Sequence, residues 1–308
     1  MTTPAVVTEP ELETEKKRPK GKETHDASTG RAGWFVYGAL AVIVFLWVVP
    51  TLGILLTSFR SRDDSKSGGW WNLFLHPGQF ANLTIENYDT AINGTNLGEG
   101  FVNSLAIALP ATFIPILIAA FAAYAFTFMR FWGRDVLFII IVSMLVVPNF
   151  VSFVPMLRLY RDYTPLGGTF PAVWLFHVGF GMSLAIYMIR NYMSTLPTTV
   201  IESAKIDGAS HFQTFWQLVL PMSVPVLASF AIFQFLWVWN DLLVALVFLG
   251  PGEKAPMTVA ISQLLGQQGQ GQEFVTAAGM FSMILPIVVF LSLQRFFVRG
   301  LTAGAVKG

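Results

Sequence analysis

Cysteine is absent from this 308-residue sequence, and charged residues make up only 12% of it. The absence of cysteine excludes a disulfide framework, a thiolate metal site and a cysteine nucleophile. With so few charges and 54% hydrophobic residues, the chain has too little polar surface to cover a soluble globule of its size. Its net charge of +1 gives no electrostatic basis for binding nucleic acid. We therefore expect an integral membrane protein.

The sequence also lacks a Gly-x-x-x-x-Gly-Lys-Ser/Thr phosphate loop and any clustered metal ligands. We therefore expect no cofactor and no metal in this chain, and no catalytic activity of its own. If the protein is driven by ATP, the nucleotide must bind to another polypeptide.

Six apolar stretches are each close to the ~20 residues that a helix needs to cross about 30 Å of hydrocarbon. Helices are expected because a backbone in lipid must satisfy its own hydrogen bonds, and a barrel would show shorter alternating segments. The sequence thus predicts an all-α fold with six transmembrane helices. They cover residues 34–59, 101–129, 136–158, 170–192, 223–249 and 274–297.

Polar tails flank this predicted six-helix domain, residues 33–299. Residues 1–32 are charged and poor in large apolar side chains, which is typical of a disordered tail, and residues 300–308 form a short C-terminal tail. If the N-terminus is inside, 13 of the 19 Lys and Arg residues lie on the cytoplasmic side. This bias predicts that both termini are cytoplasmic.

A polar segment, residues 194–222, separates the fourth and fifth predicted spans. Thr198 or Thr199 could cap a short helix, and Glu202 would lie near the helix N-terminus that favours a carboxylate. The pair Asp207-Gly208 predicts a sharp turn, since glycine adopts positive φ readily. A second amphipathic helix would then follow, until Leu220-Pro221 stops it. We expect a helix-turn-helix element on the cytoplasmic face.

This segment resembles the EAA motif of bacterial ABC importer permeases, which depend on an external binding protein. The residues that carry the resemblance are Glu202, Ser203, Ala204, Lys205, Ile206, Asp207, Gly208 and Ala209, followed by Phe212, Phe215, Leu220 and Pro221. Ser203 stands where the family usually has alanine. The resemblance implies a coupling helix that docks onto an ATP-hydrolysing subunit. It further implies that Gly208 permits the turn, while Glu202 and Asp207 orient it and contact the ATPase.

Other local matches are similar to the carbohydrate branch of this family, which contains the smaller membrane subunit of the maltose transporter. They include Asn103-Ser104, Trp239-Asn240-Asp241 and the C-terminal stretch 294–308. The resemblance implies a bacterial inner-membrane complex with a homologous permease subunit, two ATPase subunits that bind ATP and Mg²⁺, and an extracytoplasmic sugar-binding protein. The implied substrates are oligosaccharides or α-glucosides such as maltose or trehalose.

Two polar positions inside the apolar stretches are candidates for the translocation path. Asn240 and Asp241 lie in the fifth predicted span, where an ionisable residue is costly and often functional. They could instead bond a neighbouring helix or face a water-filled cavity without touching substrate. His177, in the fourth span, is interpreted as a hydrogen-bonded packing residue.

Three other readings stay open. A permease of the same superfamily could carry another solute, such as glycerol-3-phosphate, although the predicted spans are nearly free of the basic residues that a phosphate would favour. An ion-coupled secondary transporter predicts inverted repeats and acidic pairs, and the sequence has no clear repeat and one Asp in a span. A membrane enzyme would need clustered catalytic groups, which the sequence does not show.

Overall fold

A computed structural model describes residues 31–266 and 271–302, and every regular element within these ranges is a helix. Of the two predicted tails, residues 1–30 and 303–308 lie outside the described residues. Internal contacts divide the chain into two units, Met1–Pro50 and Thr51–Gly308, which are described separately.

The first unit contains most of helix α1 (Arg31–Ser58), which continues into the second unit. Its apolar side chains point in all directions and are exposed, among them Trp34 and Trp47. A helix that is apolar on every face and covered by little protein is suited to lipid. Pro50 lies inside α1 without ending it.

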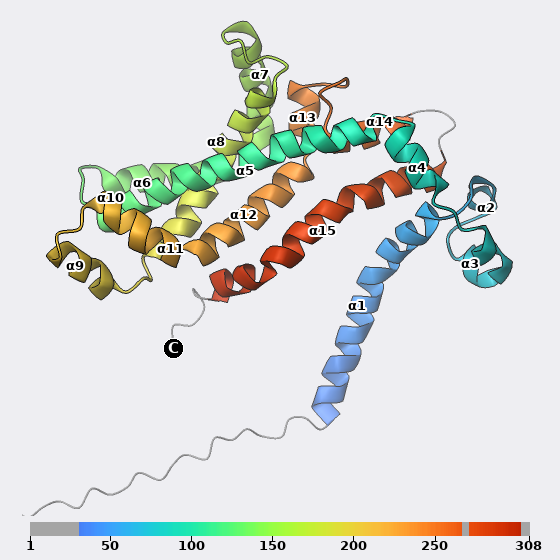
Figure 1. The fold of residues 1–308 in the computed structure, drawn as a ribbon, viewed down its shortest axis with the longest axis horizontal. Coiled ribbons are helices and arrows are strands. Elements are labelled where there is room, and N and C mark those ends of the chain that lie inside the picture. Colours follow the sequence, from blue (N-terminus) through green and yellow to red (C-terminus); the bar gives the residue numbers. More distant parts are fainter. Residues whose placement is uncertain (1–30, 267–270, 303–308) are drawn as a thin grey trace, which may run out of the picture. The chain divides into compact units, whose positions relative to one another are not determined.

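The centre of the second unit is a bundle of four helices, in which α5 packs along α8 and α12 packs against both α5 and α15 (Figure 1). Their bounds are α5 (Leu97–Phe128), α8 (Phe170–Met193), α12 (Val224–Trp239) and α15 (Gln272–Thr302). Small side chains line the buried side of α5, where they let neighbouring backbones approach closely. They are Ala108, Ala111, Ala119, Ala120 and Ala123.

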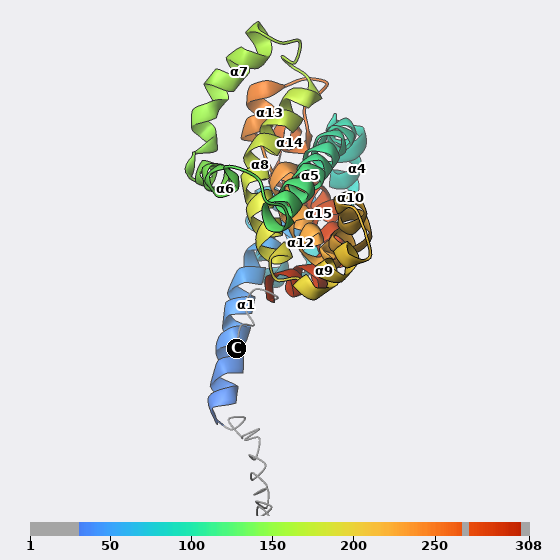
Figure 2. The ribbon, with the colours of Figure 1, turned by 90° about the vertical axis from the view of Figure 1, so that its left-hand side faces the viewer.

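The third predicted span is not one continuous helix, and this part of the prediction is wrong. Its two halves, Arg134–Val146 and Asn149–Asp162, meet at an angle of 95°, and the sharp bend is clear in Figure 2. Pro148 supplies the physical reason. It lacks a backbone N–H and pushes the residue before it into an extended conformation, and Val147 accordingly has ψ of 119°.

The fifth predicted span is also interrupted. Helix α12 ends at Trp239, and a separate helix, α13 (Leu243–Phe248), begins four residues later. Asp241 lies in this break. Its carboxylate accepts hydrogen bonds from the N–H groups of Val244 and Ala245 in the first turn of α13, which takes the place of bonds within a continuing helix. The prediction that Asn240 and Asp241 lie within a helix is therefore wrong.

Shorter elements complete the second unit. Before the bundle come α2 (Arg62–Lys66), α3 (Asn72–Leu75), η1 (Pro77–Asn82) and α4 (Glu86–Asn93). The broken third segment contains α6 (Arg134–Ser143), η2 (Met144–Val146), η3 (Asn149–Ser152) and α7 (Phe153–Asp162). Between α8 and α12 lie α9 (Thr198–Ile206), α10 (His211–Thr214), η4 (Phe215–Val219) and α11 (Leu220–Met222), and α14 (Met257–Gly266) follows α13.

Four described helices are long and apolar enough to cross a membrane, and the number is six if each of two bent pairs counts as one span. One bent pair is the broken third segment. The other joins His211–Met222 to Val224–Trp239 at 69°. The chain therefore crosses the membrane several times, as the composition predicts.

Gln234 of α12 ties three bundle helices together. Its buried amide donates to the carbonyl of Ala111 on α5 at 3.2 Å and to that of His177 on α8 at 3.3 Å. Gly181 makes room for it, since a Cβ at this position would lie 2.6 Å from the Gln234 amide oxygen.

Gly181→Ala is therefore expected to displace the Gln234 amide and to lower the stability of the protein by about 1–3 kcal/mol, the cost of leaving buried polar groups without partners. The measurement is the thermal unfolding midpoint in detergent. Gly179→Ala, two residues along the same helix with open space around its Cβ, is the matched control and should not lower it. If the Gly181 variant is as stable as the control, this packing argument is wrong.

Candidate functional site

The segment that resembles the EAA motif forms two short helices joined by a glycine turn. Helix α9 begins at Thr198 directly after Pro197, so the predicted threonine cap is wrong. Its C-terminus is closed by two backbone bonds, from Gly208 N–H to the Lys205 carbonyl at 3.1 Å and from Ala209 N–H to the Ala204 carbonyl at 2.9 Å. This is the Schellman pattern. Gly208 has φ of +82°, so the glycine turn is present as predicted.

The second half of the segment starts with a reciprocal cap. Ser210 Oγ accepts from the Gln213 N–H at 3.3 Å, and Gln213 Oε1 accepts from the Ser210 N–H at 2.9 Å. The helix then widens into the π-helical turn η4 before Pro221. It continues through Leu220 and Pro221 to Met222, so the prediction that Leu220-Pro221 stops the helix is wrong. A wide turn is suited to this place because proline cannot donate a hydrogen bond and crowds the preceding turn.

Aromatic contacts anchor this segment to α5. Phe215, which is 3% exposed, stacks on Phe121 with ring centroids 4.5 Å apart. Tyr124, one turn further along α5, forms a 3.0 Å hydrogen bond with His211 Nδ1. These contacts fix the second half of the segment against the bundle, with Phe215 and Tyr124 as the buried partners.

The opposite side of the segment is exposed. Phe212 is 67% exposed although it is a large apolar residue. The other exposed positions of the predicted coupling set are Glu202, Ser203, Asp207, Gly208 and Pro221, whereas Ala204, Ala209 and Leu220 are half-buried. The structure thus separates the predicted set into one buried anchor, Phe215, and a surface that carries two carboxylates and an exposed aromatic ring.

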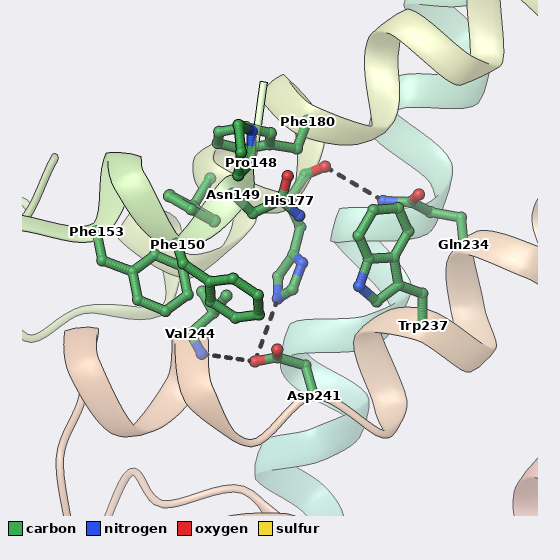
Figure 3. Close-up of a pocket in the computed structure, with 11 residues that line it drawn as sticks. Pro148, Asn149, Phe150, Phe153, His177, Phe180, Gln234, Trp237, Asp241 and Val244 are labelled. Atoms are coloured by element: carbon green, nitrogen blue, oxygen red, sulfur yellow. Dashed lines mark hydrogen bonds and ion pairs between the residues drawn. The ribbon is translucent and has the colours of Figure 1, made fainter. Parts of the chain in front are cut away.

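A second candidate site is a cavity of about 290 Å³ inside the bundle (Figure 3). Its walls come from the break in the third segment, from α8, from α12 and from the break before α13. Phenylalanine rings cover much of it, and polar atoms come from Asn149, His177, Gln234 and Asp241. Trp237 lies beside Gln234 and is also part of the wall.

Asp241 is held rigidly at the edge of this cavity. Its Oδ2 accepts from the N–H groups of Val244 at 2.9 Å and Ala245 at 3.3 Å. His177 Nε2 lies 3.9 Å from the same oxygen, too far for a direct hydrogen bond. The structure therefore places Asp241 and His177 together, so His177 is part of the cavity wall as well as a packing residue.

Asn240, the other predicted path residue, does not line the cavity. Its amide donates to the Leu236 carbonyl of its own helix at 2.8 Å, and its side chain is exposed.

The sequence did not predict three of the residues that line the cavity, namely Gln234, Trp237 and Asn149. A neutral amide within an apolar run was the available signal for Gln234, whereas nothing in the sequence distinguishes Trp237 from the other aromatic residues.

The comparisons with known proteins agree on a family. Residues 101–303 match the family model described as the binding-protein-dependent transport system inner membrane component. The chain is 50% identical over 273 residues to the osmoprotective compounds uptake permease protein GgtD of Synechocystis, covering 88% of this chain and 91% of the relative. It is 37% identical to the alpha-glucoside transport system permease protein AglG of Rhizobium meliloti, covering 89% and 97%.

The fold has a solved counterpart. A chain from the crystal structure of a bacterial ABC transporter that imports the acidic polysaccharide alginate aligns with a TM-score of 0.72. The alignment covers 89% of this chain and 99% of that one, at 20% identity. At this identity, the likeness establishes the fold alone.

The cap formed by Asp241 yields a stability prediction. Asp241→Ala removes the acceptor of two N–H groups and should lower stability by about 1 kcal/mol, the usual cost of losing a helix cap. Asp241→Asn keeps an acceptor oxygen and should cost clearly less. Thermal unfolding of both variants in detergent distinguishes them, and equal losses would show that the cap contributes little.

Proposed function

Because the chain belongs to the family of binding-protein-dependent transport system inner membrane components, we propose that it is one permease subunit of an ATP-driven sugar importer. It forms half of the translocation pathway beside a homologous permease subunit. Two separate ATPase subunits bind ATP and Mg²⁺, and an extracytoplasmic sugar-binding protein delivers the substrate. Both termini of this chain are cytoplasmic, and the chain itself is a non-catalytic subunit of the complex.

The surface around Glu202, Asp207 and Phe212 is the proposed contact with an ATPase subunit. An exposed aromatic ring on a segment that also exposes two carboxylates is costly to leave in water and is suited to a protein partner. Gly208 makes the turn that presents this surface. When ATP binding closes the ATPase pair, the movement reaches the bundle through Phe215 and Tyr124, which connect the segment to α5.

The cavity beside Asp241 is the proposed part of the substrate path. Aromatic rings with a few neutral amides and one carboxylate are suited to a polyhydroxylated ring, which needs both a stacking face and hydrogen-bond partners. The 37% identical relative named for alpha-glucosides supports this class. We therefore propose oligosaccharides or α-glucosides, such as maltose or trehalose, as substrates.

A permease for glycerol-3-phosphate is the alternative within the same family. No Lys or Arg is among the described residues that line the cavity, and a phosphate would favour such a residue. An ion-coupled secondary transporter is a further alternative. It would move solute along an ion gradient without ATP, so uptake by the reconstituted complex with and without ATP decides between these mechanisms.

The proposed coupling surface yields a paired prediction. Phe212→Ala removes an exposed ring, so stability should change by less than about 0.5 kcal/mol, while co-purification of the ATPase subunit and ATP-dependent uptake should both fall. Phe215→Ala removes a buried ring and should destabilise the protein by about 3–5 kcal/mol. The measurements are thermal unfolding and recovery of the ATPase with a tagged permease. Normal assembly and uptake in the Phe212 variant would contradict the coupling role.

The proposed substrate path yields another prediction. In a reconstituted complex, uptake of radiolabelled α-glucoside should exceed that of glycerol-3-phosphate, and Trp237→Ala should reduce glucoside uptake about tenfold, the effect of losing roughly 1.4 kcal/mol of ring stacking. Trp132→Ala, the same change at a fully exposed ring outside the cavity, is the matched control. Preferred uptake of glycerol-3-phosphate would overturn the sugar assignment, and normal glucoside uptake by the Trp237 variant would exclude this wall from the path.

A further inference from the structure

The segment that follows α1, residues 60–85, folds back beside the end of that helix. Buried Arg60, which is 1% exposed, holds the fold-back together. Its guanidinium donates to the carbonyl oxygens of Asp64 and Gly68, the latter at 2.7 Å, and reaches Gln79 Oε1 at 3.5 Å. Since one side chain bonds three points of the segment, the path of the chain here is fixed.

Trp70 shows how far the segment returns. Its indole ring packs so closely against Gly53 of α1 that a Cβ on that glycine would lie 2.5 Å from Trp70 Nε1. Gly53 lies five residues before the end of α1 at Ser58, which is about 7 Å at 1.5 Å per residue. Trp70 therefore lies beside the last turns of α1 rather than beyond them, and helix α3, which begins two residues later, lies near this end of α1 (Figure 1).

The side chains around Trp70 form an exposed apolar patch. Edge-to-face contacts link Trp70 to Trp71 and Phe74, and Phe74 to Phe80. Trp71 is 56% exposed, and Leu75, at the end of α3, is 68% exposed. Trp70 contacts Gly53 of α1, and the two neighbours of Gly53 in the chain, Leu52 and Ile54, are exposed apolar residues. A contiguous group of exposed apolar side chains such as this one marks a surface that contacts lipid or another protein.

From this continuity we infer that residues 70–75 lie in the lipid interface, on the leaflet where α1 ends. Leu52 and Ile54, the neighbours of Gly53 in α1, are exposed apolar residues and are suited to lipid, and a surface held at the same depth meets the same surroundings. Tryptophan rings favour this layer because one edge is polar and the rest is apolar. A segment lying in the interface buries its apolar side about 5–10 Å deep, which agrees with the depth given by Gly53. The fold-back is a membrane-surface anchor, separate from the coupling segment and the cavity.

The absence of cysteine allows a direct test with single spin labels. Trp71→Cys and Leu75→Cys place labels on the patch, and Asp63→Cys and Glu86→Cys place matched labels on exposed polar positions of the same region. Each full-length variant is reconstituted with its partner subunits in phospholipid vesicles. The complex that contains the cysteine-free chain gives the background from the partners. Collision rates are measured with oxygen, which concentrates in lipid, and with a water-soluble nickel chelate.

The ratio of oxygen to nickel collisions should be several-fold higher at positions 71 and 75 than at 63 and 86. Nickel collisions at 71 and 75 that equal those of the polar controls would overturn the inference, since the patch would then lie in water. Labels at 71 and 75 that neither reagent reaches would also overturn it, because a protein partner would then cover the patch.

Discussion

The requirement that a backbone in lipid must bond all of its polar groups governs this structure. Where a span is continuous, the helix meets the requirement by itself. Where a span breaks, another group has to replace the lost bonds. Asp241 does so before α13 by accepting from two N–H groups. The same carboxylate then borders the cavity, so one side chain both bonds the free N–H groups of the backbone and contributes to the polar wall of the site.

Three polar side chains between the packed helices meet the same requirement, since each bonds a backbone carbonyl. Gln234 is acceptable inside the bundle because its amide bonds backbone carbonyls of two neighbouring helices, and Gly181 leaves the space that these bonds require. Trp174 and Trp239 follow the same rule, since their indole N–H groups donate to the carbonyls of Ala106 and Ser282. Polar atoms thus connect helices that apolar packing alone would leave free to slide.

The length of the apolar runs was enough to predict the continuous spans, because about 20 apolar residues have few other solutions. The breaks were harder to predict. Pro50, Pro110 and Pro115 lie inside helices that continue, whereas Pro148 lies at a 95° bend, so proline alone does not decide the outcome. Gly208 was predictable because a turn with positive φ has few alternatives to glycine. The pairing of His177 with Asp241 was not, since 63 intervening positions had to be folded first.

Helix α5 explains how the two ends of the molecule can act together. Near its C-terminus, Phe121 stacks on Phe215 and Tyr124 bonds His211, and both partners belong to the segment 194–222. Near its N-terminus, Asn103 donates to the carbonyl oxygens of Glu253 and Ala255, and Ser104 accepts from Met257 N–H at 2.9 Å. The helix is continuous between these points in spite of two prolines. In the proposed coupling mechanism, α5 carries a displacement of residues 194–222 to the contacts near its N-terminus, and a continuous element with contacts at both ends is suited to switching between two states.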